Sequence, residues 1–569
     1  QTKRKIKYKI VYYIILIAAV GMILYYNSLQ GEFVFDDEAI IVKNHHIEKV
    51  RPLREAFAAP PDSPVRDRPV VNLTLSLNFL LGRRSPSGYH LVNLVIHLIS
   101  VLLLFGIVRR TFLSSRLSLR YGAVASGLAL SAALIWEVHP LQTESVTYIT
   151  QRCESLMGLF YLGMLYSIIR GSSSGRPMPW YILSVFLCGL GMGSKAVMVT
   201  APLVALIYDR IFLARDWKEV RDGRGGLYLA LAATWIIQII LLLTTSYQDI
   251  KTYLPLEYAL TQFGVITYYI RLIFIPYPLC LDYYWPTVQG VAEIIPGALF
   301  VVSLLSLTVW GLIKNPPLGF AGVWFFLILA PTSSILPLED IAFEHRLYLP
   351  LAAVAVLGVV GGYEILRRLF SESSIRQRNS AIILTVIIVA GLGVLTIRRN
   401  ADYRTAVRMW RDVIRKRPAN PRAYNNLGNL INKQGDYRQA LELYQTAVLV
   451  DPGYPAAYYN LANILAGEGK MEEAAGYYEE ALEISPEAVE VHNNLGVTLF
   501  NLGRRNEALG HYREAMRIDP ADPAGYYNLG VALIKEGRPA AARPFLEKAV
   551  ELRPDYLPAK KALNMASVQ

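Results

Sequence analysis

The sequence predicts an all-α membrane protein whose last third is a helical repeat array. Two observations lead to this fold class. Long apolar runs recur between residues 8 and 400, whereas residues 401–569 are charged and rich in Ala, Tyr and Leu. A 34-residue period then runs through residues 421–556. The step in composition divides the chain into a predicted membrane domain, 1–400, and a predicted repeat domain, 401–569.

The overall composition agrees with this division. Hydrophobic residues make up 53% of the 569 residues and charged residues 18%, against about 25% charged in soluble domains. The net charge is +12, but Lys and Arg stand at the ends of apolar runs, as the positive-inside rule expects. We therefore expect no nucleic-acid partner. Cys153, Cys188 and Cys280 lie in or beside apolar segments without CxxC spacing, which predicts neither a disulfide framework nor a zinc site.

The apolar runs predict the membrane-spanning helices, each of which needs about 20 mostly apolar residues. Eleven stretches are long and apolar enough: 8–26, 88–108, 121–137, 153–170, 179–193, 195–213, 225–245, 297–313, 318–336, 347–366 and 380–398. No small-residue cleavage site follows the first of them, which is therefore predicted to be a retained helix. A twelfth stretch, 258–280, contains Gln262 and Arg271 and is broken by Pro276 and Pro278. It is predicted to be re-entrant or interfacial.

The charges of the loops predict the orientation. The N-terminus holds Lys3, Arg4, Lys5, Lys7 and Lys9, which favours the cytoplasmic side. The loops alternate from there between basic ones and ones that hold most acids and histidines. Eleven spans then place the repeat domain outside, whereas twelve would place it in the cytoplasm. Compact loops and the absence of an ER-retrieval signal favour a bacterial inner membrane, with the repeats in the periplasm.

The 34-residue period has five aligned columns over four units. The columns are Leu427, Leu461, Leu495 and Leu529; Gly428, Ala462, Gly496 and Gly530; Ala440, Ala474, Ala508 and Ala542; Ala447, Ala481, Ala515 and Ala549; and Pro452, Pro486, Pro520 and Pro554. This is the tetratricopeptide (TPR) pattern of paired helices. The predicted units are 421–454, 455–488, 489–522 and 523–556.

A half-unit precedes the four full units. Ala406, Trp410 and Pro418 lie one period before Ala440, Tyr444 and Pro452, which predicts a second helix without its partner at 402–420. The last span ends only a few residues earlier. We therefore expect the repeats to be joined rigidly to the membrane domain.

TPR arrays usually bind peptides or proteins in their concave groove. Asparagines that recur on the first helices are candidates for hydrogen bonds to a bound acceptor peptide: Asn425, Asn426, Asn460, Asn494 and Asn528. Tyrosines recur beside them, and for these the alternative is packing between helices.

The first outer loop holds three adjacent acids, Asp36, Asp37 and Glu38, between apolar residues. Carboxylates can act as a general base or bind a metal, and the alternative is a solvated acidic patch. Other ionisable residues recur at the outer turns: Arg68, His90, His139, Glu144, Arg152, Lys195, His345 and Arg346. A lone cation at a helix end often has no further role than to extend its charged group to the membrane surface. Charges at membrane depth, however, are costly and indicate function. This mixture of charges suits the transfer of a group from a phosphate-linked lipid. The cations would hold the phosphate of the lipid leaving group, and a carboxylate would take the proton from an acceptor hydroxyl.

Several short motifs occur in a specific order: "FVFDDEAI", "RPVVNLTLSLNFLLG", "HPLQTESVTYITQR", "SKAVMVTAPLVALIYD" and "EHRLYLP", followed by the TPR units. In this order the chain resembles the transmembrane-and-TPR O-mannosyltransferases and their bacterial relatives, which are glycosyltransferases of the GT-C fold. The resemblance covers nearly the whole chain. It implies a GT-C membrane domain of about eleven helices, a polyprenyl-phosphate sugar donor, and a Ser or Thr acceptor presented by the repeats.

The resemblance also implies roles for particular residues. Relatives keep an acidic pair in the first outer loop, whose first acid is the catalytic base; Asp36 with Asp37 is the first match and Asp37 with Glu38 the second. A basic residue holds the donor phosphate, for which Arg346 and Lys195 match best, followed by His345 and Arg152. Relatives that use lipid monophosphates largely need no metal, and none is expected here. The alternatives are a GT-C enzyme acting on a lipid or polysaccharide, and a non-enzymatic membrane-anchored TPR scaffold.

Overall fold

The computed structural model describes residues 2–49, 51–60, 63–244 and 253–568. The chain divides into two compact units, Gln1–Met409 and Trp410–Gln569. The described residues contain helices and connecting segments and no strand, so the predicted all-α class is confirmed. Residue 245 of the predicted 225–245 span, and residues 246–252 of the predicted outer loop after it, lie outside the described residues.

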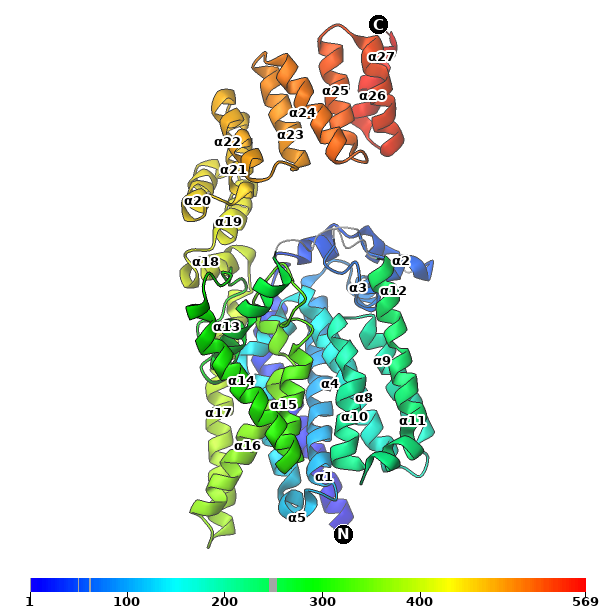
Figure 1. Ribbon diagram of the computed structural model, residues 1–569, viewed down its shortest axis with the longest axis vertical. Helices are drawn as coiled ribbons and strands as arrows, with labels where there is room; N and C mark the ends of the chain where they lie inside the picture. The colour runs from blue at the N-terminus through cyan, green and yellow to red at the C-terminus, as the bar shows by residue number, and fades with distance from the viewer. Residues whose placement is uncertain (1, 50, 61–62, 245–252, 569) are drawn as a thin grey trace. The chain divides into compact units, whose positions relative to one another are not determined.

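Long helices make up the first unit (Figure 1). They are α1 (Thr2–Tyr25), α4 (Pro86–Phe112), α6 (Ala125–Val138), α8 (Arg152–Ser172), α9 (Met178–Met192), α10 (Ala201–Tyr208), α11 (Trp217–Ala233), α12 (Trp235–Thr244), α13 (Pro255–Phe274), α14 (Val291–Lys314), α15 (Pro316–Leu329), α16 (Pro350–Leu369) and α17 (Ser374–Asp402).

Short helices connect them. They are η1 (Tyr26–Gln30), η2 (Glu38–Val42), η3 (His45–Glu48), α2 (Leu53–Phe57), α3 (Pro69–Gly82), α5 (Ser118–Tyr121), η4 (Gly122–Val124), η5 (Pro140–Gln142), α7 (Thr143–Thr147), η6 (Ile149–Gln151), η7 (Ala196–Thr200), η8 (Asp209–Leu213) and η9 (Glu344–Leu347).

Eight helical stretches among the described residues are long and apolar enough to cross a membrane: Tyr8–Gln30, Pro86–Phe112, Ser118–Val138, Ala196–Leu213, Trp217–Thr244, Val291–Lys314, Pro350–Leu369 and Ser374–Asp402. All eight coincide with predicted spans. Two further predicted spans coincide with α9 and α15, which are shorter apolar helices. The remaining one is α8, whose first turn carries Arg152 and Glu154. Eleven spans therefore remain a prediction, as does the re-entrant or interfacial nature of 258–280, where α13 forms one continuous helix.

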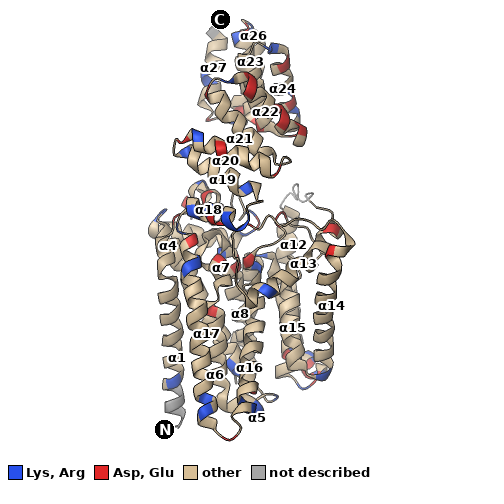
Figure 2. Ribbon diagram, turned by 90° about the vertical axis from the view of Figure 1, so that its left-hand side faces the viewer, with Lys and Arg blue, Asp and Glu red and all other residues tan. Residues whose placement is uncertain are grey.

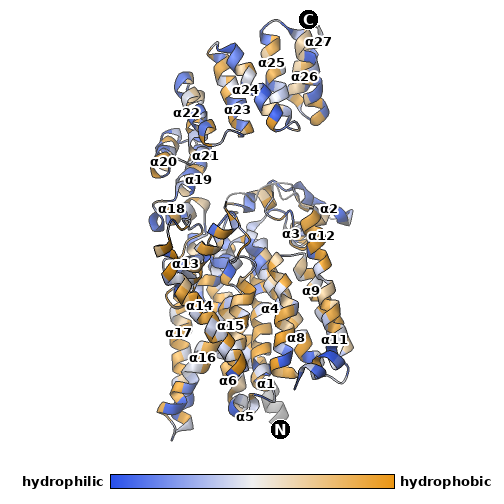
Figure 3. Cartoon of the chain, viewed as in Figure 1, coloured by the Kyte–Doolittle hydropathy of each residue, from blue (hydrophilic) through white to orange (hydrophobic). Residues whose placement is uncertain are grey.

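The surface of the long helices suits a lipid environment. Large apolar side chains lie outward on α14, where Leu299 is 65% exposed and Ile313 is 72% exposed. Figure 3 shows hydrophobic residues along the outer helices of this unit, such as α12 and α14. Exposed apolar area of this extent marks a membrane or partner surface. Together with the eight spans, it makes the chain an integral membrane protein.

Basic residues gather at the end of this unit that holds its N-terminus (Figure 2). Arg109 and Arg110 end α4, and Arg367 and Arg368 end α16. This is the charge distribution that predicts a cytoplasmic N-terminus.

The connection between α6 and α8 runs inside the unit. Every residue of 136–158 is buried, although connecting segments usually run over the surface. Trp136 Nε1 donates to the Tyr348 carbonyl at 2.8 Å. A Cβ on Gly158 would lie 2.5 Å from the Tyr348 ring, so a glycine is needed for the close approach of Tyr348. This buried connection carries much of the site described below.

The second unit is a series of helix pairs (Figure 1). Its helices follow α18 (Ala406–Lys416) and are α19 (Pro421–Lys433), α20 (Tyr437–Val450), α21 (Pro455–Gly467), α22 (Met471–Ile484), α23 (Val489–Asn501), α24 (Arg505–Ile518), α25 (Pro523–Lys535), α26 (Pro539–Leu552) and α27 (Leu557–Val568). The first helix of each pair is followed by a glycine with positive φ: Gly435, Gly469, Gly503 and Gly537. The predicted repeat fold is confirmed, and α27 is an additional helix after the last unit.

One prediction concerns the small-residue column of the repeats. A Cβ on Gly496 would lie 2.5 Å from Tyr512 Cε1, whereas a Cβ on Gly510 would meet nothing within 4 Å. Gly496→Ala should destabilise α23 and α24 by about 1–3 kcal/mol through overpacking. Gly510→Ala, the matched control, should stabilise α24 by about 1 kcal/mol because Ala favours helix. Hydrogen exchange of full-length protein measures both, and equal effects would contradict this packing.

A second prediction concerns the neighbouring side chains His492 and His511, whose Nδ1 atoms are 2.9 Å apart. Burial lowers the pKa of His511, and the charge of His492 lowers it further. The folded state therefore favours neutral His511, so this contribution to stability is present above the usual pKa of about 6.5 and is lost as the pH falls below it. Amides of α23 and α24 should exchange faster at pH 5.5 than at pH 7.5, after correction for intrinsic rates. His511→Gln should reduce this difference.

Candidate active site

The acidic loop, residues 33–38, joins η1 to η2. Phe35 has a φ of 50°, in the left-handed region that side chains with a Cβ rarely adopt. The turn is held by backbone bonds from Asp37 N to the Val34 carbonyl and from Ala39 N to the Asp36 carbonyl, both 3.0 Å long. The two adjacent acids consequently have different surroundings.

Asp37 is completely buried and is held by three donors. Its Oδ1 accepts from Thr150 N at 2.8 Å and from Thr150 Oγ1 at 2.7 Å, and its Oδ2 accepts from Val34 N at 3.0 Å. Burial raises the pKa of Asp37 to about 7, although these hydrogen bonds oppose the rise. Asp37 therefore ties the acidic loop to the buried connection.

Asp36 is half-buried and is the better placed of the two to meet a substrate. Its Oδ2 accepts from Tyr148 Oη at 2.8 Å. Glu38, the third acid of the loop, lies 3.4 Å from Lys43 at the surface. Of the two aspartates, Asp36 is therefore the more accessible.

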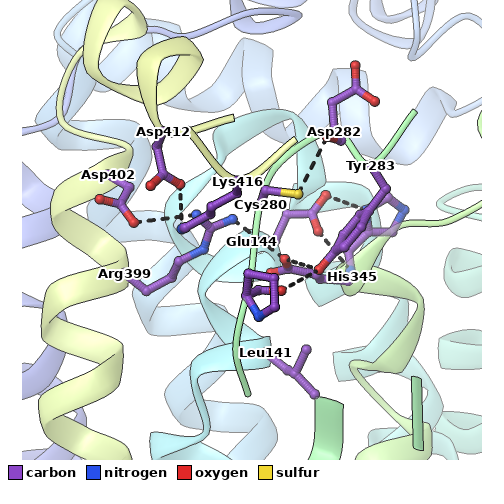
Figure 4. Close-up of polar contacts among 12 residues, drawn as sticks. Leu141, Glu144, Cys280, Asp282, Tyr283, His345, Arg399, Asp402, Asp412 and Lys416 are labelled. Atoms are coloured by element: carbon purple, nitrogen blue, oxygen red, sulfur yellow. Dashed lines mark hydrogen bonds and ion pairs between the residues drawn. The ribbon is translucent and has the colours of Figure 1, made fainter. Parts of the chain in front are cut away.

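A second group of charges surrounds Glu144 of α7 and His345 of η9 (Figure 4). His345 Nδ1 lies 2.7 Å from Glu144 Oε1, and its backbone N–H donates to Glu144 Oε2 at 3.0 Å. Burial raises the pKa of Glu144, as does the charge of Glu344. Burial lowers the pKa of His345, and the charges of Lys195, Arg346 and Arg68 lower it further.

The lowered pKa of His345 shows which of the predicted cations act on this residue. The positive charges of Arg68, Lys195 and Arg346 all lower the pKa of His345, so these three cations lie within electrostatic reach of this histidine. A bound anion would find several positive charges there.

Each of the three cations also has partners within the protein. Lys195 forms an ion pair with Glu154. Arg346 is buried and donates to the carbonyls of Thr332, Ile341 and Asp340 and to Tyr258 Oη. Arg68 donates to Cys153 Sγ at 3.2 Å and lies 3.4 Å from Asp67. Arg346 thus bonds to three carbonyl oxygens and one phenol.

The remaining predicted residues make structural contacts. Arg152 is fully buried and donates to Asn93 Oδ1, Asn78 Oδ1 and the Tyr89 carbonyl at 2.7–3.0 Å. His90 Nε2 lies 3.3 Å from the Gly31 carbonyl. His139 accepts from Leu141 N and lies 3.0 Å from the Ile273 carbonyl.

The sequence analysis missed residues at the end of α17. Arg399 lies 3.6 Å from Glu344 Oε1, which accepts from Tyr283 Oη at 2.8 Å (Figure 4). Arg399 also donates to Tyr403 Oη at 3.1 Å. The available signal in the sequence was an aromatic residue, Tyr403, four positions after Arg399.

An apolar groove of about 560 Å³ lies among α6, α16, α17 and the end of α13. On α16 it extends from Leu351 to Leu366, about 22 Å at the rise of an α-helix, against about 30 Å for the hydrocarbon core of a bilayer. Its glycines are Gly358, Gly362 and Gly391. A Cβ on any of them would meet nothing within 4 Å. His139 and Leu395 line the groove, and Arg399 follows Leu395 by one helical turn.

Four of the five asparagines predicted to bind an acceptor form hydrogen bonds with asparagines of neighbouring units. Asn460 donates to Asn425 Oδ1 at 2.7 Å, and Asn528 donates to Asn493 Oδ1 at 3.3 Å. Asn494 donates to Asn463 Oδ1 at 2.9 Å, and Asn426 is half-buried. These contacts link the first helices of successive units, so binding of an acceptor by the asparagines remains a prediction.

No group of three or more His, Cys, Asp or Glu side chains suited to a metal ion occurs within the described part of the chain. In the candidate site, carboxylates are paired instead with cations, as Glu154 is with Lys195, and with phenols, as Asp36 is with Tyr148.

Comparison with known families gives two matches along the chain. Residues 62–243 match the family described as dolichyl-phosphate-mannose-protein mannosyltransferase. Residues 432–489, 498–537 and 523–556 match tetratricopeptide repeat families. The combination of a mannosyltransferase-type membrane domain and TPR repeats that the motifs predicted is confirmed.

Curated relatives are similar over most of this chain. The protein O-mannosyl-transferase TMTC3 of Mus musculus is 25% identical over 74% of this chain and 49% of its own length. The protein O-mannosyl-transferase F38B6.6 of Caenorhabditis elegans is 25% identical over 74% of this chain and 60% of its own length. The chain thus spans about half the length of the mouse relative. Among solved structures, the crystal structure of MamA covers 29% of this chain at 23% identity, with a TM-score of 0.25 and 94% of its own length covered.

The different surroundings of the two acids give a prediction. Asp37→Asn should weaken the acidic loop by about 1–3 kcal/mol, because an amide group would face donors of Thr150 or Val34. Asp36→Asn keeps an oxygen that can accept from Tyr148 on a half-buried side chain, and should destabilise the protein less, by about 0.5 kcal/mol. Thermal unfolding of the purified variants measures the contrast. Equal destabilisation by the two variants would contradict the distinction between the acids.

Proposed function

We propose that this chain, a relative of the transmembrane-and-TPR protein O-mannosyl-transferases, transfers a hexose from a polyprenyl-phosphate donor to Ser or Thr hydroxyls of proteins. Mannose is the first candidate for the sugar. The observation that carries the proposal is a half-buried carboxylate, Asp36, in the same compact unit as a buried pair, Glu144 and His345, whose histidine is within electrostatic reach of Arg68, Lys195 and Arg346. The match of 62–243 to a mannosyltransferase family supports it.

In the proposed reaction Asp36 acts as the general base. It takes the proton of the acceptor hydroxyl as the hydroxyl oxygen attacks the anomeric carbon. The bond from that carbon to the phosphate oxygen breaks, and the lipid phosphate leaves with the electron pair. Arg346, Lys195 and Arg68 would stabilise the negative charge that develops on the phosphate. The reaction needs no metal in this proposal.

The apolar groove supports a lipid-linked donor. It extends along most of the bilayer thickness, and its end near His139 and Leu395 lies one turn of α17 from Arg399, which pairs with Glu344. The proposed hydrocarbon tail would lie in the groove and would leave the phosphate near the cations around His345. The absence of side chains at the three groove glycines gives such a tail room.

The proposed acceptor is a protein segment presented by the TPR repeats, with its backbone hydrogen-bonded by asparagines of the first helices. The proposed location is a bacterial inner membrane, with the N-terminus in the cytoplasm and the repeats outside. The basic residues at the end of the first unit that holds its N-terminus support this orientation.

The test is transfer by the purified full-length protein. The donor is a synthetic polyprenyl-phosphate mannose, and the acceptors are a Thr-containing peptide and the same peptide with Val in place of Thr. Mass spectrometry should detect an added hexose on the Thr peptide only. Asp36→Asn should reduce the rate by at least about 100-fold, the lower range for general base catalysis. An Asp36→Asn variant with wild-type activity would reject Asp36 as the base.

The groove gives a prediction with a matched control. Gly358→Leu places a side chain into the groove, whereas Gly361, on the same helix, does not line it. Gly358→Leu should raise the KM for a long-chain donor about tenfold or more and change the KM for a short-chain donor much less, because only the long tail fills the groove. Gly361→Leu should affect neither. Equal KM values for both variants with the long-chain donor would contradict this location of the tail.

A further inference from the structure

We propose that Tyr148 is a positioning residue for Asp36, and that Tyr403, just after α17, holds Tyr148 in place. The inference rests on the proposed function, in which Asp36 is the base. It assigns a role to the end of the last membrane helix that neither the family matches nor the motifs indicate.

The first step is the contact between Tyr148 and Asp36. The Tyr148 hydroxyl donates to Asp36 Oδ2 at 2.8 Å and accepts from the Asp36 backbone N–H at 3.2 Å. One hydroxyl therefore fixes both the main chain and the carboxylate of the same residue. An ionised carboxylate has about four lone-pair sites, so accepting a hydrogen bond from Tyr148 does not use up its capacity to accept a proton.

The second step is what fixes Tyr148. Its side chain is almost fully buried, and its ring stacks on the ring of Tyr403, with centroids 6.3 Å apart and planes 24° apart. Tyr403 Oη accepts from Arg399, whose guanidinium also lies 4.9 Å from the centre of the Tyr403 ring. The orientation of Tyr148 thus depends on the residues that follow the last membrane helix.

The third step is how the end of α17 is tied to the acidic loop. Thr147, beside Tyr148, donates to Asn400 Oδ1 at 2.9 Å. Asn400 Nδ2 in turn donates to the Leu24 carbonyl at 3.0 Å and to Asn27 Oδ1 at 3.1 Å. Glu32 N donates to the Arg404 carbonyl at 3.1 Å. The end of α17 and the residues after it therefore contact the segment just before Tyr148 and the segment before Asp36.

The acidic loop itself requires such support. Phe35, directly before Asp36, has a positive φ, a conformation that costs about 1–3 kcal/mol and persists only where the surroundings impose it. Thr150 holds Asp37 and Tyr148 holds Asp36. The two contacts from one short segment set the position of both acids.

The experiment measures donor turnover and peptide transfer by the full-length protein with the polyprenyl-phosphate mannose probe. Tyr148→Phe keeps the ring and removes the hydroxyl. Its kcat should fall about 10–100-fold, as expected when a reacting group is misplaced, while the KM for the donor changes less than twofold. The acid limb of the pH–rate profile should move up by about one pH unit, because the carboxylate loses a donor that favours its ionised form.

Two variants of Tyr403 separate its ring from its hydroxyl. Tyr403→Leu removes the stacking on Tyr148 and should lower kcat and shift the pH profile as Tyr148→Phe does. Tyr403→Phe keeps the ring and should retain most of the wild-type activity. The control is Tyr161→Phe, because Tyr161 is a fully buried tyrosine of α8 whose hydroxyl lies 3.2 Å from Thr200. It should leave kcat and the pH profile unchanged.

A readout without activity separates this inference from the proposed function. Hydrogen exchange of the amides of residues 34–42 should increase in Tyr148→Phe and in Tyr403→Leu, but not in Tyr161→Phe. If exchange is unchanged, or if Tyr148→Phe keeps the wild-type pH profile while Asp36→Asn is inactive, the positioning role is wrong and the function stands. If no variant or wild-type protein turns over the donor, the function is wrong, and the exchange data alone decide whether Tyr148 orders the loop.

Discussion

The structure of the membrane unit depends on burying the connection between α6 and α8. A buried segment must find partners inside the protein for the polar groups of its main chain and side chains, and here several partners come from segments far apart in the sequence. Thr150 donates to Asp37, Thr147 donates to Asn400, and Glu144 accepts from the backbone of His345. Each of these bonds satisfies a buried polar group and at the same time fixes a segment of the candidate site.

This constraint explains why the site combines acids and cations with few exposed groups. Glu144, Glu344, His345 and Arg346 are all buried, and a buried charge is costly unless it is paired or hydrogen-bonded. The protein meets that cost with ion pairs, phenols and, for Arg346, three carbonyl groups. Such a preorganised environment strengthens electrostatic interactions with a transition state, because no solvent has to reorganise.

The period-34 columns and the apolar runs were enough to predict the repeats and the membrane helices, because each depends on local patterning. The acidic loop could also be predicted, since three acids between apolar residues are conspicuous. The roles of Tyr148, Arg399 and Tyr403 could not. Tyr148 and Asp36 are 112 residues apart, and Thr147 and Asn400 are 253 apart. No local pattern specifies such pairs, and an aromatic after a membrane helix is common. For Arg152 the position in the sequence suggested a phosphate ligand, and the structure adds that its guanidinium donates to the buried amides of Asn93 and Asn78.

The acids at positions 36 and 37 are adjacent, and the residues that hold them, Tyr148 and Thr150, are two apart on a short helical turn. This match has an evolutionary consequence. Inserting one residue directly before Asp36 would move Asp36 opposite Thr150 and leave no acid opposite Tyr148, whereas deleting one would place Asp37 opposite Tyr148 and Glu38 opposite Thr150. The lengths of both segments are therefore expected to change little during divergence, while their sequences vary, and the loops at the opposite end of the helices remain free to lengthen or shorten.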